Sequence, residues 1–131
     1  MKVAAIIAEY NPLHNGHEFQ IKRARQLTGA DFIIIVMSGD FTQRGVPAVI
    51  DKYQRTKMAL NAGADLVIEM PLYYSCSSAE YFASGAINLL KGLGVVDYLV
   101  FGSDLVYPVD SSGQLNLIIT KGQKDRFICA K

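Results

Sequence analysis

One stretch decides the fold of this chain: Ala8-Glu9-Tyr10-Asn11-Pro12-Leu13-His14-Asn15-Gly16-His17. It follows an apolar run, Val3 to Ala8, that predicts a buried strand, and it precedes a segment, residues 18–27, that predicts a helix. The first turn of a helix carries unpaired backbone N–H groups and a partial positive charge, so this junction favours an anion. His14 and His17 add donors that can carry a proton near neutral pH, although a histidine here can also be a cap or a surface residue.

Three more apolar runs predict strands, and amphipathic segments between them predict helices. The strands are expected at 32–37, 65–70 and 95–101. Their unbroken apolar character is typical of parallel strands that are covered on both faces. We therefore expect an α/β, Rossmann-like parallel sheet with helices on both faces and strand order 3-2-1-4. Strands 1 and 4 are then neighbours, and His14, His17 and Gly102 face one crevice beyond their carboxyl ends.

Capping residues mark the predicted helix boundaries. The first helix ends at Gly29 and is expected to bury Phe19, Ile21, Ala24 and Leu27 and to expose Lys22, Arg23 and Arg25. The second begins after Asp51 and runs to about Asn61. The last begins near Ser77-Ser78, ends at Gly92 and Gly94, and has an apolar face of Ala79, Phe82, Ala83, Ala86, Leu90 and Leu93. Beyond Asp104 the pattern fades, and 115–120 and 126–130 fit either short strands or an unsettled tail.

Size and composition limit the possible classes of protein. A chain of 131 residues, half of them hydrophobic, can form one domain with a real core. Its net charge of +1 lacks the electrostatic footprint of a nucleic-acid-binding protein. Cys76 and Cys129 show no metal-ligand spacing, so we predict neither a metal site nor a structural disulfide. Without a signal peptide or a membrane-length apolar run, the sequence predicts a cytoplasmic protein.

The loop after the second strand, residues 38–47, is longer than most strand-to-helix connections, and long loops often carry function. Asp40 has two interpretations: a ligand of Mg²⁺ or of a substrate amine, or an Asx-turn residue after Gly39. Gln43 and Arg44 fit the binding of a carboxylate, a phosphate or a nucleic acid, and they equally fit a plain exposed loop.

Several charged and aromatic residues near this loop also have open roles. Glu9 ends a buried strand, and we expect it to orient a neighbour through a hydrogen bond because an unpaired buried carboxylate is costly. Lys52 and Arg55 share a helix face from which Lys57 is displaced, and a solvated face is the default interpretation. Packing is favoured over base stacking for Tyr73-Tyr74.

Five stretches resemble, in the same order, the bacterial tRNA(Met) cytidine acetate ligases. They are residues 6–17, residues 38–45, Asp51-Lys52-Tyr53 with Arg55 and Lys57, Ala79-Glu80-Tyr81-Phe82, and Phe101-Gly102-Ser103. The pattern His-x-Gly-His at 14–17 is shared by the whole superfamily of nucleotidyltransferases. All five stretches together make the resemblance specific, and it covers about residues 1–104.

This resemblance implies a function. Members of the family activate acetate with ATP to acetyl-adenylate and transfer the acetyl group to N4 of the wobble cytidine of elongator tRNA(Met). His14 and His17 would contact the phosphates as catalytic residues, Gly102 would adjoin adenine or ribose, and Mg²⁺ would accompany ATP. The implied ATP-site residues are Ile7, Ala8, Glu9, Tyr10, Asn11, Pro12, Leu13, His14, Asn15, Gly16, His17, Glu18, Phe19, Gln20 and Gly102.

The resemblance also sets an expected domain organisation. Residues 1–104 are expected to form the nucleotide-binding domain, and residues 105–131 a divergent tail, truncated relative to the longer family members. Two other interpretations stay open: an adenylyltransferase acting on a phosphorylated cofactor precursor, and a non-enzymatic nucleotide-binding remnant. Apolar surface left uncovered by a truncation would favour a homodimer.

Overall fold

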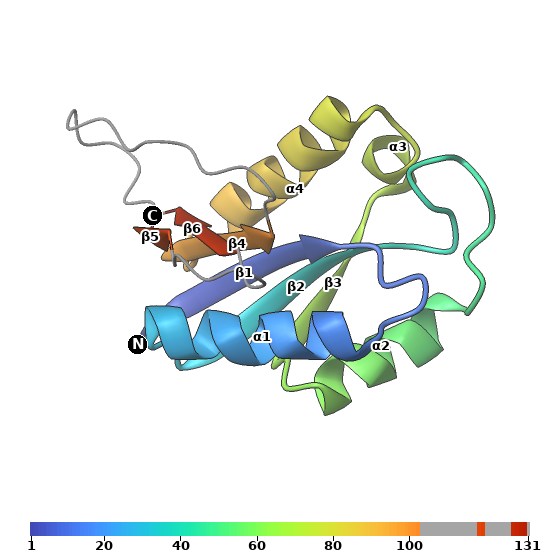
Figure 1. The fold of residues 1–131 in the computed structure, drawn as a ribbon. Coiled ribbons are helices and arrows are strands. Elements are labelled where there is room, and N and C mark those ends of the chain that lie inside the picture. Colours follow the sequence, from blue (N-terminus) through green and yellow to red (C-terminus); the bar gives the residue numbers. More distant parts are fainter. Residues whose placement is uncertain (103–117, 120–126, 131) are drawn as a thin grey trace.

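A computed structural model of the chain describes residues 1–102, 118–119 and 127–130, which form a six-stranded sheet with helices on both faces (Figure 1). The sheet order is β3-β2-β1-β4-β6-β5. The parallel strands are β1 (Val3–Ala8), β2 (Phe32–Ser38), β3 (Leu66–Met70) and β4 (Tyr98–Gly102). Their order, 3-2-1-4, confirms the predicted Rossmann-like arrangement.

Two short strands extend the sheet beyond β4. They are β5 (Ile118–Ile119) and β6 (Phe127–Ala130), and both pair in the antiparallel direction. The sequence left open whether this part of the chain forms short strands or an unsettled tail. The six residues of β5 and β6 form strands. Because β6 pairs with β4, the sheet continues past β4. The two edge strands of the sheet are β5 and β3.

Two apolar cores explain why the central strands show no alternation of polar and apolar residues. Along β2, Ile33, Ile35 and Met37 belong to one core, and Ile34 and Val36 to the other. The first core lies under α1 (Asn15–Thr28) and α2 (Lys52–Asn61), and the second under α4 (Ala79–Leu93). Figure 1 shows α1 and α2 on one face of the sheet and α4 on the other.

Helix α1 differs from the predicted pattern at four positions. Leu27, predicted to be buried, and Arg23, predicted to be exposed, are both half-buried. The buried residues of α1 are Ile21, Ala24 and Thr28, whereas Phe19, predicted to be buried, is 42% exposed. At 100° per residue, Phe19 lies about 160° around the helix from Ile21, so it faces away from the sheet. Arg25 lies on the buried side of the same helix and is half-buried, not exposed as predicted. Gly29 ends α1 with φ 62°, as predicted.

The crossover from β3 to β4 contains a short helix, α3 (Leu72–Ser75), that the sequence pattern did not predict. Tyr74 in α3 packs into the second core, where a side chain at Gly85 of α4 would collide with its ring. Tyr73 is 75% exposed, so the packing interpretation holds for Tyr74 alone. Gly94 ends α4 with φ 67°, whereas Gly92 lies inside the helix, contrary to its predicted role as a terminator.

Other predicted boundaries and faces shift by small amounts. Strand β4 begins at Tyr98, three residues after the predicted start, and β3 one residue after its predicted start. On α4, Ala86 and Leu90 are buried as expected, but Ala79 and Leu93 at its two ends are exposed. Within the described residues, no helix has both the length and the apolar character needed to cross a membrane.

Candidate functional site

The chain leaves β1 through a sharp turn, as Asn11-Pro12 predicted. The Asn11–Pro12 peptide is cis, and Tyr10 has a φ of 50°, in the left-handed region that side chains other than glycine seldom adopt. Tyr10 is nevertheless 1% exposed and belongs to the first core, so packing holds its backbone in place. This turn delivers Leu13 and His14 to the beginning of α1.

His14 and His17 together cap α1. His14 is the N-cap residue, and its Nδ1 accepts a hydrogen bond from the backbone N–H of Gly16 at 3.1 Å. In return, Nδ1 of His17 accepts one from the backbone N–H of His14 at 3.3 Å. The two imidazole rings stack with centroids 3.7 Å apart and planes inclined by 24°. Both histidines therefore cap the helix through Nδ1, and their Nε2 atoms take no part in the capping bonds.

The capping bonds assign the protonation state of the pair. A nitrogen that accepts a hydrogen bond has no proton, so each neutral ring carries its proton on Nε2. Burial lowers the pKa of His17, and the nearby His14 lowers it further. The neutral form of His17 is therefore favoured over the charged form. The pair offers two Nε2–H donors beside the positive end of the α1 dipole.

Tyr10 supports this pair from within the core. Its ring lies 4.9 Å from that of His17, centroid to centroid, at an angle of 54°. Burial raises the pKa of the Tyr10 phenol, and its hydroxyl has no hydrogen-bond partner among the described residues. Tyr10 is thus a neutral packing surface beneath His17.

The remaining residues predicted for an ATP site run from the end of β1 into the first two turns of α1. Ile7 and Ala8 end β1, and Leu13 packs against the first core. Asn15 and Gly16 are exposed at the helix start. Glu18 pairs with Lys22 at 2.5 Å. Pro12 and Phe19 are exposed, and Gln20 is half-buried.

Asp40 lies in an ion-pair cluster at the start of α2. Its carboxylate lies 3.6 Å from Nζ of Lys52 and accepts the backbone N–H of Lys52 at 3.3 Å. The same Nζ contacts both carboxylate oxygens of Glu69 at 2.9 Å, which raises the pKa of Lys52. Asp40 thus has a cationic partner already. In the ranges that the structure describes, no three His, Cys, Asp or Glu residues are grouped so that they could hold a metal ion.

Glu9 orients the loop after β2 instead of the histidines. Its carboxylate accepts the backbone N–H of Gln43 at 2.5 Å, and Oδ1 of Asn11 accepts that of Val49 at 2.7 Å. Gln43 is half-buried, whereas Arg44 is exposed at the tip of the loop. The loop predicted to bind substrate is therefore tied directly to the turn that carries the histidines.

The position of Arg55 differs most from its prediction. The default prediction placed it on a solvated helix face shared with Lys52, but Arg55 is completely buried. Its guanidinium donates to backbone carbonyls of several segments. Because its hydrogen-bond acceptors are backbone carbonyls, no residue pattern in the sequence pointed to this role.

Gly102 lies at the same edge of the sheet as the histidine turn. In the register between β1 and β4, Ile6 pairs with Val100, so Gly102 is two residues beyond this pair, at the carboxyl end. Among the described residues, a side chain at Gly102 would meet no atom within 4 Å. That the two histidines face Gly102 across one crevice stays a prediction.

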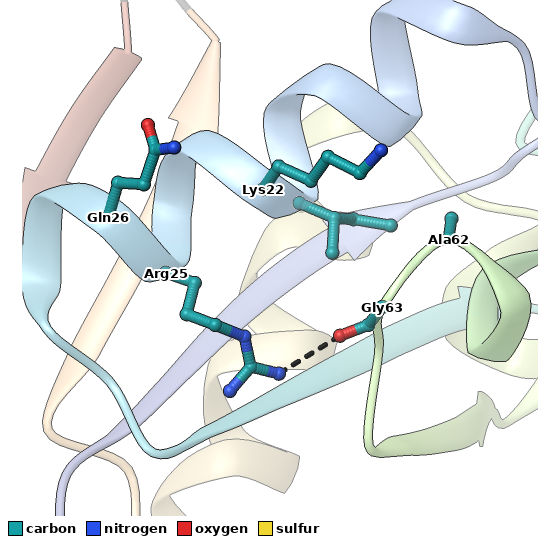
Figure 2. Close-up of a pocket in the computed structure, with 6 residues that line it drawn as sticks. Lys22, Arg25, Gln26, Ala62 and Gly63 are labelled. Atoms are coloured by element: carbon teal, nitrogen blue, oxygen red, sulfur yellow. Dashed lines mark hydrogen bonds between the residues drawn. The ribbon is translucent and has the colours of Figure 1, made fainter.

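A pocket of about 290 Å³ lies elsewhere, between α1 and the turn after α2 (Figure 2). Arg25 crosses it to bind the Gly63 carbonyl at 3.0 Å and the Asp65 carboxylate at 2.6 Å. It also donates to the Asp31 carbonyl at 2.6 Å. Because Asp31 and Asp65 precede β2 and β3, this pocket is at the amino end of the sheet, opposite the histidines.

Comparison with known proteins gives consistent results. A family model described as HIGH Nucleotidyl Transferase matches residues 1–122. The tRNA(Met) cytidine acetate ligases of Acetivibrio thermocellus and Clostridium kluyveri are each 58% identical to 104 residues of this chain, 79% of its length. The crystal structure of Thermotoga maritima TmcAL bound with alpha-thio ATP is 50% identical, with a TM-score of 0.76 over 79% of this chain. These matches cover 25%, 26% and 25% of the relatives, so the chain spans about a quarter of their length.

Proposed function

The chain belongs to the HIGH nucleotidyl transferase family, and we propose that it binds ATP at the carboxyl edge of its sheet. The observation that carries this proposal is the reciprocal capping of α1 by His14 and His17. It leaves two Nε2–H donors beside a helix N-terminus, an arrangement suited to phosphate oxygens. The structure of the Thermotoga maritima relative bound with alpha-thio ATP supports the binding of ATP.

We propose that the nucleotide contacts the stretch from Ile7 to Gln20 together with Gly102. The phosphates would lie over the start of α1, where Asn15 and Gly16 are exposed. Adenine or ribose would lie against Gly102, where a side chain is absent and space is open. Tyr10 is buried and would act through its contact with His17, without touching the ligand.

The reaction proposed for the complete protein is that of the tRNA(Met) cytidine acetate ligases. A carboxylate oxygen of acetate attacks the α-phosphorus of ATP, and pyrophosphate leaves with the electrons of the broken P–O bond. The cytidine N4 amine of elongator tRNA(Met) then attacks the acetyl carbon and loses a proton, and AMP leaves. His14 and His17 would donate to the oxygens on which negative charge grows as pyrophosphate departs.

Mg²⁺ would enter with the nucleotide. Mg²⁺ keeps several waters and is usually held by one or two carboxylates plus substrate phosphates. Asp40 is the acidic residue of the loop tied to the histidine turn, but Lys52 already pairs with it. We therefore propose that the ATP phosphates supply the metal ligands, and that Gln43 and Arg44 on the same loop contact acetate, phosphate or tRNA. Action on tRNA would place the protein in the cytoplasm.

Titration calorimetry of this chain with ATP and Mg²⁺ tests the proposal. We expect weak but saturable binding that the variant His14→Asn greatly reduces, since asparagine keeps the cap and removes the Nε2–H donor. Absence of heat and of any change in melting temperature at millimolar ATP would refute ATP binding. For the complete protein, pyrophosphate exchange that depends on acetate supports the ligase, and exchange that depends on a phosphate monoester supports an adenylyltransferase.

A homodimer is a secondary proposal. Several large apolar side chains are exposed along the outer strand β3 and on α3, among them Leu66, Leu72 and Tyr73. Exposed apolar surface of this kind favours association. Light scattering after size-exclusion chromatography tests for the homodimer, and a single monomeric species at high protein concentration would refute it.

A further inference from the structure

Arg55 is a charged residue in the interior of the protein. It lies in α2, is 0% exposed, and makes no contact with a carboxylate within 4 Å in the described part of the chain. Burial lowers the pKa of its guanidinium, while the more distant charges of Asp40, Asp51, Glu9 and Glu69 favour the charged form. A buried charge without a direct counter-ion is costly and needs a full set of hydrogen bonds.

The hydrogen bonds of Arg55 join three separate segments. Nη1 donates to the carbonyl of Glu9 at 2.7 Å, directly after β1, and to that of Ser38 at 3.1 Å, at the end of β2. Nη2 donates to the carbonyl of Gly39, and Nε to that of Ile50 at 2.8 Å, just before α2. One side chain thus links the turn that carries His14 with both ends of the loop after β2.

Polar contacts, and not packing, hold this loop. Between residues 40 and 50, Thr42 is the one buried residue, and Val49 is 77% exposed. Two other hydrogen bonds connect the loop with the histidine turn. The backbone N–H of Gln43 donates to the Glu9 carboxylate, and that of Val49 donates to Oδ1 of Asn11. With so little apolar burial, the loop position depends on these bonds and on Arg55.

We propose that Arg55 is the positioning residue of the ATP site: it locks the loop of residues 38–50 against the histidine turn, so that both reach the nucleotide in one fixed geometry. This inference rests on the proposed function. The planar guanidinium is essential to it, because its donors diverge toward carbonyls of three segments. A lysine at this position keeps the charge but has a single nitrogen, which cannot span them.

Arg25 provides a matched control at the opposite end of the sheet. It too donates to carbonyls of separate segments, those of Ala30, Asp31 and Gly63, and it also binds Asp65. Figure 2 shows Arg25 reaching Gly63 in the pocket away from the histidines. Arg25→Lys therefore removes a similar guanidinium clamp without touching the proposed ATP site.

The test compares the wild type, Arg55→Lys and Arg25→Lys by amide hydrogen exchange and by calorimetry with MgATP. In Arg55→Lys we expect the Gln43 and Val49 amides to lose protection and ATP affinity to fall about tenfold, which corresponds to 1.4 kcal/mol. In Arg25→Lys we expect lower stability, unchanged protection of these two amides, and ATP affinity within about twofold of the wild type.

Several outcomes would overturn the inference. The first is an Arg55→Lys variant whose amide protection and ATP affinity equal those of the wild type. The second is an equal loss of ATP affinity in Arg55→Lys and Arg25→Lys, because such a loss would reflect lower stability alone. If Arg55→Lys does not fold, all three proteins are compared in trimethylamine N-oxide, which favours the folded state. If the wild type does not bind ATP, the proposed function fails, and the exchange data still decide whether Arg55 locks the loop.

Discussion

His14 and His17 stack their rings with centroids 3.7 Å apart, and each accepts through Nδ1 a backbone N–H at the start of the same helix. The pair is thus part of the helix cap as well as the proposed phosphate site. A substitution that removes an imidazole changes the stability of α1 and the binding of ATP at once. The first prediction separates these two effects.

His14→Ala should lower the free energy of unfolding by about 0.5–2 kcal/mol, the usual cost of losing an N-cap. His14→Asn should restore most of the stability, since its side-chain oxygen can cap. Both variants should lose about 1.5–3 kcal/mol of ATP binding, the range for a hydrogen bond to a charged group. Urea unfolding and calorimetry measure the two quantities, and ATP binding that follows stability instead of the imidazole would contradict the assignment.

Acidification should destabilise the chain through His17. Its pKa in the folded protein lies below the ordinary value of 6.5 because of burial and the nearby His14, so the unfolded chain takes up the proton first. The contribution of neutral His17 to the free energy of unfolding is fully present above pH 6.5, and it is lost as the pH falls below 6.5 toward the lowered pKa. Urea unfolding at a series of pH values should show this loss, and His17→Gln should flatten the curve. An unchanged slope in His17→Gln would show that another group is responsible.

Gly102→Ala should weaken ATP binding with little effect on stability. The added methyl group meets no atom of the described residues within 4 Å, and in the proposed site it occupies space that the nucleotide would need. Gly92→Ala is the matched control, because this glycine also has open space but lies inside α4. It should raise the free energy of unfolding by about 0.5–1 kcal/mol through helix propensity and leave ATP binding unchanged. Equal ATP affinity in Gly102→Ala and the wild type would remove Gly102 from the site.

Tyr10→Phe should stabilise the chain by about 1 kcal/mol, because it removes a buried hydroxyl that has no partner and keeps the ring against His17. Tyr53→Phe, at a position that is 71% exposed, should have no effect. Thermal and urea unfolding of both variants measure the difference. Destabilisation of Tyr10→Phe would mean that the hydroxyl binds a buried water, and the packing role of Tyr10 would need revision.

The sequence by itself determined the four parallel strands, the three longer helices and their order. Apolar runs without alternation predicted the parallel strands, and Asp51, Gly29 and Gly94 marked helix ends through local bonds and left-handed backbone. These signals are readable because each depends on a few neighbouring residues. The expected boundary of the nucleotide-binding domain at residue 104 stays a prediction.

The tertiary structure decided which polar groups meet. Arg55 reaches carbonyls that are 46 residues away at Glu9 and 17 at Ser38, and Glu9 reaches the amide of Gln43 across 34 residues. Their partners are backbone atoms, which every residue possesses, so no spacing in the sequence points to them. The exposure of Phe19 and the partial burial of Arg25 likewise depend on which side of α1 packs against the sheet. Side chains alone predicted the histidine site, whereas the geometry that holds it comes from long-range bonds to the main chain.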